Sequence, residues 1–142
     1  MNFIDRALAR GRGRRLNDDD FLQAMADIYR EPQVWQELDR YPPYIRDVIY
    51  VIDYDTEVQM EGLDACAVCP RVEQYIQALL NCGAVSEAEI LKRAKELTDS
   101  GPDGEDEAVD AEMESLYRQI ALNRNYEEFW ELVRGYIGRE RK

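Results

Sequence analysis

The chain has 142 residues, enough for one domain with a hydrophobic core, and its 45% apolar content excludes an intrinsically disordered protein. The formal net charge is −12 and there is no histidine, so the commonest general base and the commonest metal ligand are absent. We therefore expect no enzyme, no catalytic residue, no metal site and no cofactor. The three cysteines, the lack of a signal peptide and the lack of a transmembrane-length apolar segment indicate a cytoplasmic protein.

Residues 1–16 form a basic N-terminal arm. Five arginines accompany one carboxylate, Asp5, so this segment carries +4 and the other 126 residues carry −16. A helix is expected over residues 2–10, and the glycines of GRGRR interrupt it. A basic cluster is typical of nucleic-acid binding. Because the body is so acidic, we favour instead an arm that lies on the protein's own surface or on a second copy in a homodimer.

An acidic helical domain is expected over residues 17–138, followed by a charged tail over 139–142. Asn17 and the following aspartates predict the cap and acidic first turn of a helix that ends near Arg30. Pro32 begins a short helix that ends before the prolines at 42 and 43.

The stretch from Tyr41 to Gly62 predicts the central helix of the fold, over about residues 43–60. Ile45, Val48 and Ile49 recur at helical spacing, and the apolar arc is wide enough for a largely buried helix. The β-branched run VIYVI would also suit a strand. Its length, its periodicity and its helical neighbours favour the helix.

The second half of the chain predicts further helices. The segment LDACAVC suits one or two turns, a helix follows Pro70 and is capped by Gly83, and the sequence from Ser86 to Glu89 is a capping box. A loop covers residues 98–106, a helix runs over 107–123, and a last helix begins near Asn125. The fold class is therefore all-α, a single compact domain of seven to eight helices around the central one.

Two motifs that could carry chemistry have structural alternatives. Cys66 and Cys69 form a CxxC, which could be a redox pair or half of a zinc site. Only Cys82 remains as a further sulfur ligand, so we favour thiols in a buried turn. Residues 99–110 imitate a calcium loop weakly, because glycine stands at position three, where a ligand is expected, and we expect an acidic loop.

Asp53 and Glu57 lie four residues apart on the central helix, with Asp55 between them on another face. Paired carboxylates can act as acid and base. They can also bind backbone groups or arginines at the edge of a core, and we favour this role because no partner base is present.

Surface carboxylates are the more informative acidic residues, because helical carboxylates three or four residues apart are spaced about 5–6 Å, on the scale of nucleic-acid charge spacing. Smaller clusters contain Glu87, Glu89 and Glu96. The predicted partner-binding residues are Asp18, Asp19, Asp20, Asp103, Glu105, Asp106, Glu107, Asp110 and Glu114.

The central stretch and the helices after it resemble the bacterial DNA-mimic protein family over about residues 20–137. Its pattern has an apolar helix that ends in an acidic residue and Glu-Val, an Asn-Gly-Gly-Phe turn, and two helices with Ala-Leu and Ile-Leu pairs. The turn reads Met60-Glu61-Gly62-Leu63 here, and DACAVCP replaces the family's aromatic run. The matching residues, which we expect to be structural, are Asp55, Glu57, Val58, Gly62, Ala78, Leu79, Gly83, Ala84, Ile90, Leu91, Ala94 and the segment LYRQIA from Leu116 to Ala121.

The resemblance implies an all-α acidic protein that occupies the cationic surface of a DNA-binding protein, with carboxylates in place of phosphates. It implies a basic protein partner and no direct contact with nucleic acid or membrane. One alternative is an immunity protein that inhibits a basic toxin such as a nuclease. The other is a thiol-dependent redox protein or enzyme that uses Cys66 and Cys69.

Overall fold

The predicted central helix is α3, which runs from Pro43 to Glu61 in the computed structural model. The structure describes residues 2–9, 16–100 and 107–141. Pro43 occupies the first turn of α3, where a missing backbone N–H costs no hydrogen bond. Ile45, Val48, Ile49 and Val51 have no exposed surface, so α3 is buried over most of its circumference.

The other described elements are also helices, and the described residues form no strand. The all-α prediction is therefore confirmed. The helix that Asn17 caps is shorter than expected, because its last turn continues as the 3-10 helix η1. None of the described helices is both long enough and apolar enough to cross a membrane. In chain order these elements are α1 (Phe3–Ala9), α2 (Asp18–Met25), η1 (Ala26–Tyr29), η2 (Pro32–Arg40), α4 (Leu63–Ala67), α5 (Val72–Asn81), α6 (Val85–Ser100), α7 (Glu107–Gln119), α8 (Ala121–Arg124) and α9 (Tyr126–Glu140).

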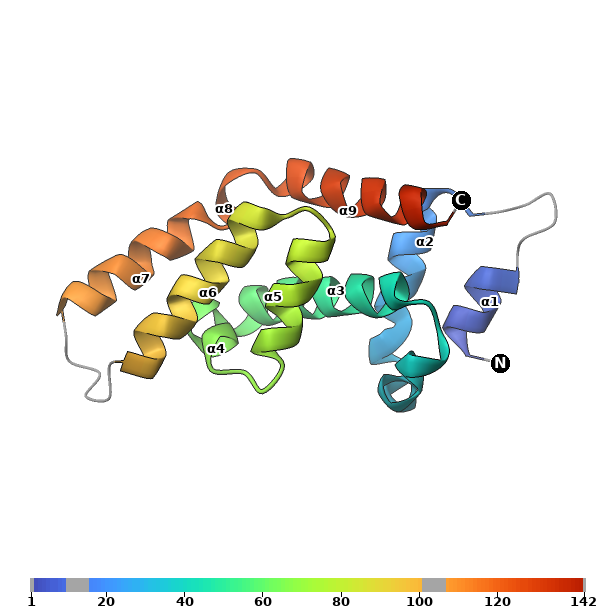
Figure 1. The fold of residues 1–142 in the computed structure, drawn as a ribbon, viewed down its shortest axis with the longest axis horizontal. Helices are drawn as coiled ribbons and strands as arrows, with labels where there is room; N and C mark the ends of the chain where they lie inside the picture. Colours follow the sequence, from blue (N-terminus) through green and yellow to red (C-terminus); the bar gives the residue numbers. More distant parts are fainter. Residues whose placement is uncertain (1, 10–15, 101–106, 142) are drawn as a thin grey trace.

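The helices form an elongated molecule (Figure 1). α3 lies along its middle, with α4 and α5 packed on it and α6 packed on both of them. α6 and α7 form one end of the molecule, whereas α1 and α2 lie toward the other end. α9 runs along one edge above α3 and contacts α2.

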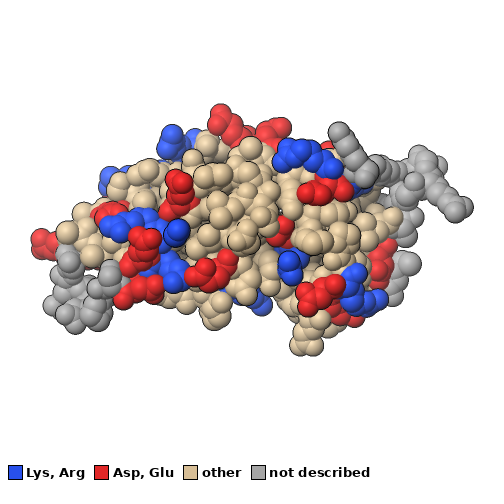
Figure 2. All heavy atoms as spheres, viewed as in Figure 1, with Lys and Arg blue, Asp and Glu red and all other residues tan. Residues whose placement is uncertain are grey.

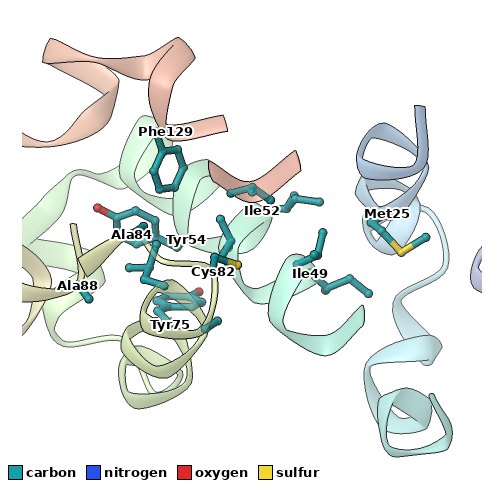
Figure 3. Packing of buried hydrophobic residues seen from close by; sticks show 14 of the residues in the cluster. Met25, Ile49, Ile52, Tyr54, Tyr75, Cys82, Ala84, Ala88 and Phe129 are labelled. Carbon is teal, nitrogen blue, oxygen red and sulfur yellow. The ribbon is translucent and has the colours of Figure 1, made fainter. Parts of the chain in front are cut away.

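The core is continuous between these ends (Figure 3). Met25 of α2 lies toward Ile49 at one end of α3, and Phe129 of α9 lies over the region of Tyr54. Ala84 and Ala88, at the start of α6, are almost fully buried. Small side chains here allow the helix to approach its neighbours closely.

Gly62 and Gly83 are the two described residues with positive φ, at 96° and 86°. Gly62 ends α3 and leads directly into α4, and its N–H donates to the Val58 carbonyl at 3.0 Å. Gly83 follows α5, and its N–H donates to the Leu80 carbonyl at 3.0 Å. Both therefore make sharp turns after an apolar helix.

We expect Gly62→Ala to lower the free energy of unfolding by about 2 kcal/mol, because φ 96° with ψ 169° is a conformation that only glycine adopts readily. The added Cβ would also lie 3.0 Å from Asp64 Oδ1. Gly83→Ala is the matched control, since φ is again positive but no atom lies within 4 Å of the new Cβ. Urea unfolding should rank Gly62→Ala as the more damaging change, and equal losses would contradict this account.

Candidate functional site

The predicted acidic strip on α7 is exposed. Glu107, Asp110 and Glu114 all lie on the surface, and neither Glu107 nor Asp110 has an ion-pair partner among the described residues. Glu114 pairs with Arg118 at 2.6 Å, but both side chains are well exposed, so this pair can exchange partners at little cost. Asp103, Glu105 and Asp106 lie outside the described residues.

α7 is held against α6 by a charged contact and an apolar one. Arg93 of α6 donates to both carboxylate oxygens of Glu112, from Nε at 2.5 Å and from Nη2 at 3.0 Å. Leu116 is buried below this contact, and Met113 packs against the core. The exposed strip therefore belongs to a helix that is fixed in place rather than to a loose arm.

The second predicted cluster, at the start of α2, is used differently. Asp18 pairs with Arg141 and Asp19 pairs with Arg134, each at 3.2 Å, so both contact α9 or the residue after it. Asp20 is exposed and pairs with no lysine or arginine of the described segments, and its N–H donates to the capping Asn17 side chain at 2.7 Å.

Arg141, the ion-pair partner of Asp18, is itself held firmly in place. Its side chain is 6% exposed, donates to the Leu16 carbonyl at 2.8 Å, and lies 4.3 Å from the centre of the Phe21 ring. A Cβ on Gly138 would lie 2.8 Å from Asp18 Oδ2, so glycine leaves room for this approach. Asp18 therefore ties the end of the chain to α2, although the sequence places Arg141 in a charged tail.

The two clusters do not form one patch, because α7 and α2 lie toward opposite ends of the molecule (Figure 1). α9 connects them, and it carries the exposed residues Glu127, Glu128 and Glu131, which the sequence analysis did not single out. Arg134 pairs with Glu131 at 2.9 Å and approaches Glu127 to 3.9 Å. Figure 2 shows acidic and basic side chains interspersed on the face drawn, with a broad uncharged area between the ends.

The Asp53–Glu57 pair is not arranged as an acid and a base. Asp53 is 6% exposed and accepts hydrogen bonds from Tyr29 at 2.6 Å, Tyr75 at 2.5 Å and Arg71 at 2.9 Å. Glu57 is half-buried, and none of the three described partners of Asp53 also bonds to it. Asp53 thus joins η1, α3 and the start of α5, which agrees with the structural role that we favoured.

Glu87 is buried, so the prediction that it belongs to a surface cluster is wrong. It is 6% exposed and accepts from the Tyr54 hydroxyl at 2.5 Å and from the Ala121 N–H at 2.9 Å. The helix begins at Val85, one residue before Ser86, and the carboxylate of Glu87 is satisfied by these two donors inside the fold. It connects α3, α6 and the start of α8.

The surroundings of Glu87 predict that the stability of the fold depends on pH. Burial raises the pKa of Glu87 above its ordinary value of 4.5, more than its two hydrogen bonds lower it. The folded state therefore binds this proton more readily than the unfolded state. Stability from this group should increase as the pH falls through the folded-state pKa toward 4.5, and it should be lost as the pH rises.

Glu87→Gln removes this titration and keeps both hydrogen bonds, with the amide oxygen accepting from Ala121 and the amide nitrogen donating to Tyr54. We expect the free energy of unfolding of the wild type, minus that of the variant, to rise as the pH is lowered from neutral. Urea titrations over a pH series measure this difference. A difference that falls with acidification would contradict the assigned pKa shift.

Tyrosine hydroxyls hold the inward carboxylates throughout the described part of the chain. The pKa of Tyr136, for example, is raised by burial and by its hydrogen bond to Asp47, so it stays protonated as a donor. These neutral donors satisfy carboxylates without a cation beside each one. The pairs are Tyr29–Asp53, Tyr41–Asp5, Tyr54–Glu87, Tyr75–Asp53, Tyr126–Asp55 and Tyr136–Asp47.

The CxxC cysteines lie in α4 and the turn after it. Cys66 is fully buried, its thiol lies 3.8 Å from the Tyr54 carbonyl, and burial raises its pKa far above the ordinary range. Cys69 is half-buried beside the Tyr75 hydroxyl at 3.7 Å. Such surroundings oppose formation of the thiolate that redox chemistry needs at Cys66. The described residues contain no cluster of three or more side chains suited to hold a metal ion.

Several of the family-motif positions make contacts within the fold. Val58 is 2% exposed, Gly62 and Gly83 make the turns after α3 and α5, and Asp55 accepts from Tyr126 at 2.9 Å. Neither the curated proteins nor the solved structures include one that matches the chain. The sequence profile of the family described as DMP19-like protein matches residues 39–139, from η2 to α9, in agreement with the DNA-mimic resemblance. The chain therefore belongs to the DMP19-like protein family.

Proposed function

We propose that this protein is a DNA mimic that occupies the cationic surface of a DNA-binding protein through its surface carboxylates. The family supports this function in general, and the net charge of −12 supports a basic partner. Glu107, Asp110 and Glu114 on α7 would take the place of phosphates opposite lysine and arginine side chains. Asp103, Glu105 and Asp106, which precede α7 in the sequence, remain predicted partner-binding residues.

The observation that carries the proposal is that α7 presents two exposed carboxylates, Glu107 and Asp110, that no described cation of the chain neutralises. Arg93 is already bound to Glu112 and Glu96, and no described cation pairs with Glu107 or Asp110. A cationic partner therefore need not break an internal ion pair to reach them. Asp18 and Asp19 contribute less to our proposed interface, because each is bound to an arginine of the same chain.

We expect neutralisation of α7 to weaken capture of the partner. Glu107→Gln with Asp110→Asn removes two exposed charges without removing a described ion pair. Since complementary charges speed association and fix the orientation of the partner, retention of the partner should fall by about tenfold. The measurement is affinity capture from native lysate on immobilised full-length protein, eluted by a salt gradient and competed by duplex DNA.

The matched control is Glu61→Gln with Glu89→Gln, which changes the net charge equally at two exposed carboxylates that belong to α3 and α6 rather than to α7. Retention of a DNA-binding protein that is competed by DNA and lost only in the α7 variant supports the proposal. If both variants lost retention of the partner equally, net charge alone would explain the loss, and the assignment to α7 would be wrong. A captured basic toxin that DNA does not displace would favour the immunity hypothesis instead.

A further inference from the structure

A groove lies between η2, α3 and α5, away from the α7 strip. Its volume is about 320 Å³, at the lower end of the range for small-molecule sites. Besides the ion pair of Asp39 and Arg46, its lining combines one carboxylate, two aromatic rings and three amides. These residues are Asp47, Trp35, Tyr50, Gln74, Gln77 and Asn81.

Asp47 is the unusual member of this set, because it is a buried carboxylate without a cation. It is 5% exposed, and no described lysine or arginine forms an ion pair with it. Its Oδ2 accepts from the Tyr136 hydroxyl at 2.7 Å and from Asn81 Nδ2 at 3.2 Å. An unpaired buried charge is costly, so such groups normally have an opposite charge nearby.

The second oxygen of Asp47 is available. Among the described residues no donor bonds Oδ1, and no fully buried side-chain oxygen lacks a partner. Oδ1 therefore keeps the small accessible surface of this residue, and Asp47 lines the groove. A donor that enters the groove would complete the coordination of the carboxylate.

The aromatic wall suits a positively charged donor. The ring centres of Trp35 and Tyr50 lie 5.6 Å apart, and both rings line the groove. Trp35 already binds one cation, since the Arg71 guanidinium lies 4.1 Å from its ring centre. Arg71 is neutralised by Asp53 and does not line the groove, so it opposes a second cation only weakly.

The remaining polar groups also favour a ligand with several N–H donors. Gln74 and Gln77 lie on one stripe of α5 with Asn81, and their amide oxygens can accept hydrogen bonds. At the rim, Arg46 lies 3.5 Å from Asp39, so these two charges balance and Asp47 leaves the groove with a charge of −1.

We infer that this groove binds an organic cation, an alkylammonium or guanidinium group that donates to Asp47 Oδ1 and lies against Trp35 and Tyr50. The same chemistry is offered by a free amine and by the lysine or arginine side chain of a bound protein. The inference does not depend on DNA mimicry, because neither the groove nor its residues belong to the α7 strip.

The test uses full-length protein with Trp130→Phe, which leaves Trp35 as its one tryptophan. Ethylguanidinium and n-butylammonium are titrated at constant ionic strength, and Trp35 fluorescence is followed. We expect a saturable change that Asp47→Asn weakens by about tenfold or more, because a charge-assisted hydrogen bond is lost. The uncharged analogue n-butanol should give no saturable change.

Asp39→Asn is the matched control, because it removes one negative charge at the rim, where the side chain is 92% exposed, and keeps Asp47. It should weaken binding by less than about twofold, since exposed charges are screened by water and salt. Equal weakening by both variants, or a change that never saturates, would overturn the inference.

If Asp47→Asn does not fold, nuclear magnetic resonance on the wild-type protein tests whether the cation binds in this groove. The Trp35 indole N–H and the Asn81 side-chain amide must shift on titration, whereas Arg124, in a separate groove of about 480 Å³, must not. Shifts spread equally over both grooves would overturn the inference.

A comparison of acetyl-Gly-Arg-Gly-amide with ethylguanidinium separates the two sources of the cation. Tighter binding of the peptide indicates a protein side chain, and tighter binding of the free cation indicates a small molecule.

Discussion

Asp53→Ala is expected to lower the free energy of unfolding by about 3–4 kcal/mol, the range for removing one partner of a buried charged pair. The change leaves the fully buried Tyr75 hydroxyl without its carboxylate acceptor and separates Arg71 from its ion pair. Arg71 is 43% exposed, so water recovers part of its loss, whereas Tyr75 has no access to water. Urea unfolding followed by circular dichroism measures the effect.

Tyr29→Phe serves as the control within the same cluster. Its hydroxyl also donates to Asp53, but the residue is 47% exposed, so water can replace the missing group and the loss should stay below about 1 kcal/mol. If Asp53→Ala were no more damaging than Tyr29→Phe, Asp53 would not be the junction between η1, α3 and α5 that the geometry indicates.

Glu87→Ala is expected to cost about 3 kcal/mol, because it leaves two buried donors, the Tyr54 hydroxyl and the Ala121 N–H, without an acceptor. The shortened side chain also leaves a cavity between α3, α6 and α8, which adds to the loss. The same unfolding measurement applies, and hydrogen exchange at Ala121 should accelerate as its amide loses its partner.

Glu89→Ala, two residues along α6, removes the same chemical group from an exposed position and should change stability by less than about 0.5 kcal/mol. Similar effects from both variants would mean that the Glu87 hydrogen bonds contribute nothing beyond a surface charge. Slow exchange at Ala121 in Glu87→Ala would lead to the same conclusion.

The sequence predicted the central helix well because its signal is local. Ile45, Val48 and Ile49 recur at helical spacing whatever surrounds them, and Pro43 and Gly62 mark the two ends of α3. Gly83 was predictable for the same reason, since a glycine after an apolar helix is the usual residue for a positive φ.

The inward carboxylates were not predictable in the same way. Glu87 lies beside Glu89 in a capping-box pattern, and only the approach of Tyr54 and Ala121, more than thirty residues away on either side, shows which of the two turns inward. No local pattern marks Asp47 as a buried carboxylate, because its donors, Asn81 and Tyr136, come from α5 and α9. The pairing of Asp18 with Arg141 likewise depends on how α2 meets α9.

The tyrosine–carboxylate pairs allow this protein to carry more acidic than basic residues. Because neutral hydroxyls hold the inward carboxylates, the chain needs few cations to keep its fold, and its 18 basic residues need not match its 30 acidic ones. Salt screens attraction between exposed charges far more than hydrogen bonds inside the core. A rise in ionic strength that releases a basic partner should therefore leave the released protein folded, so that it can bind again when the salt falls.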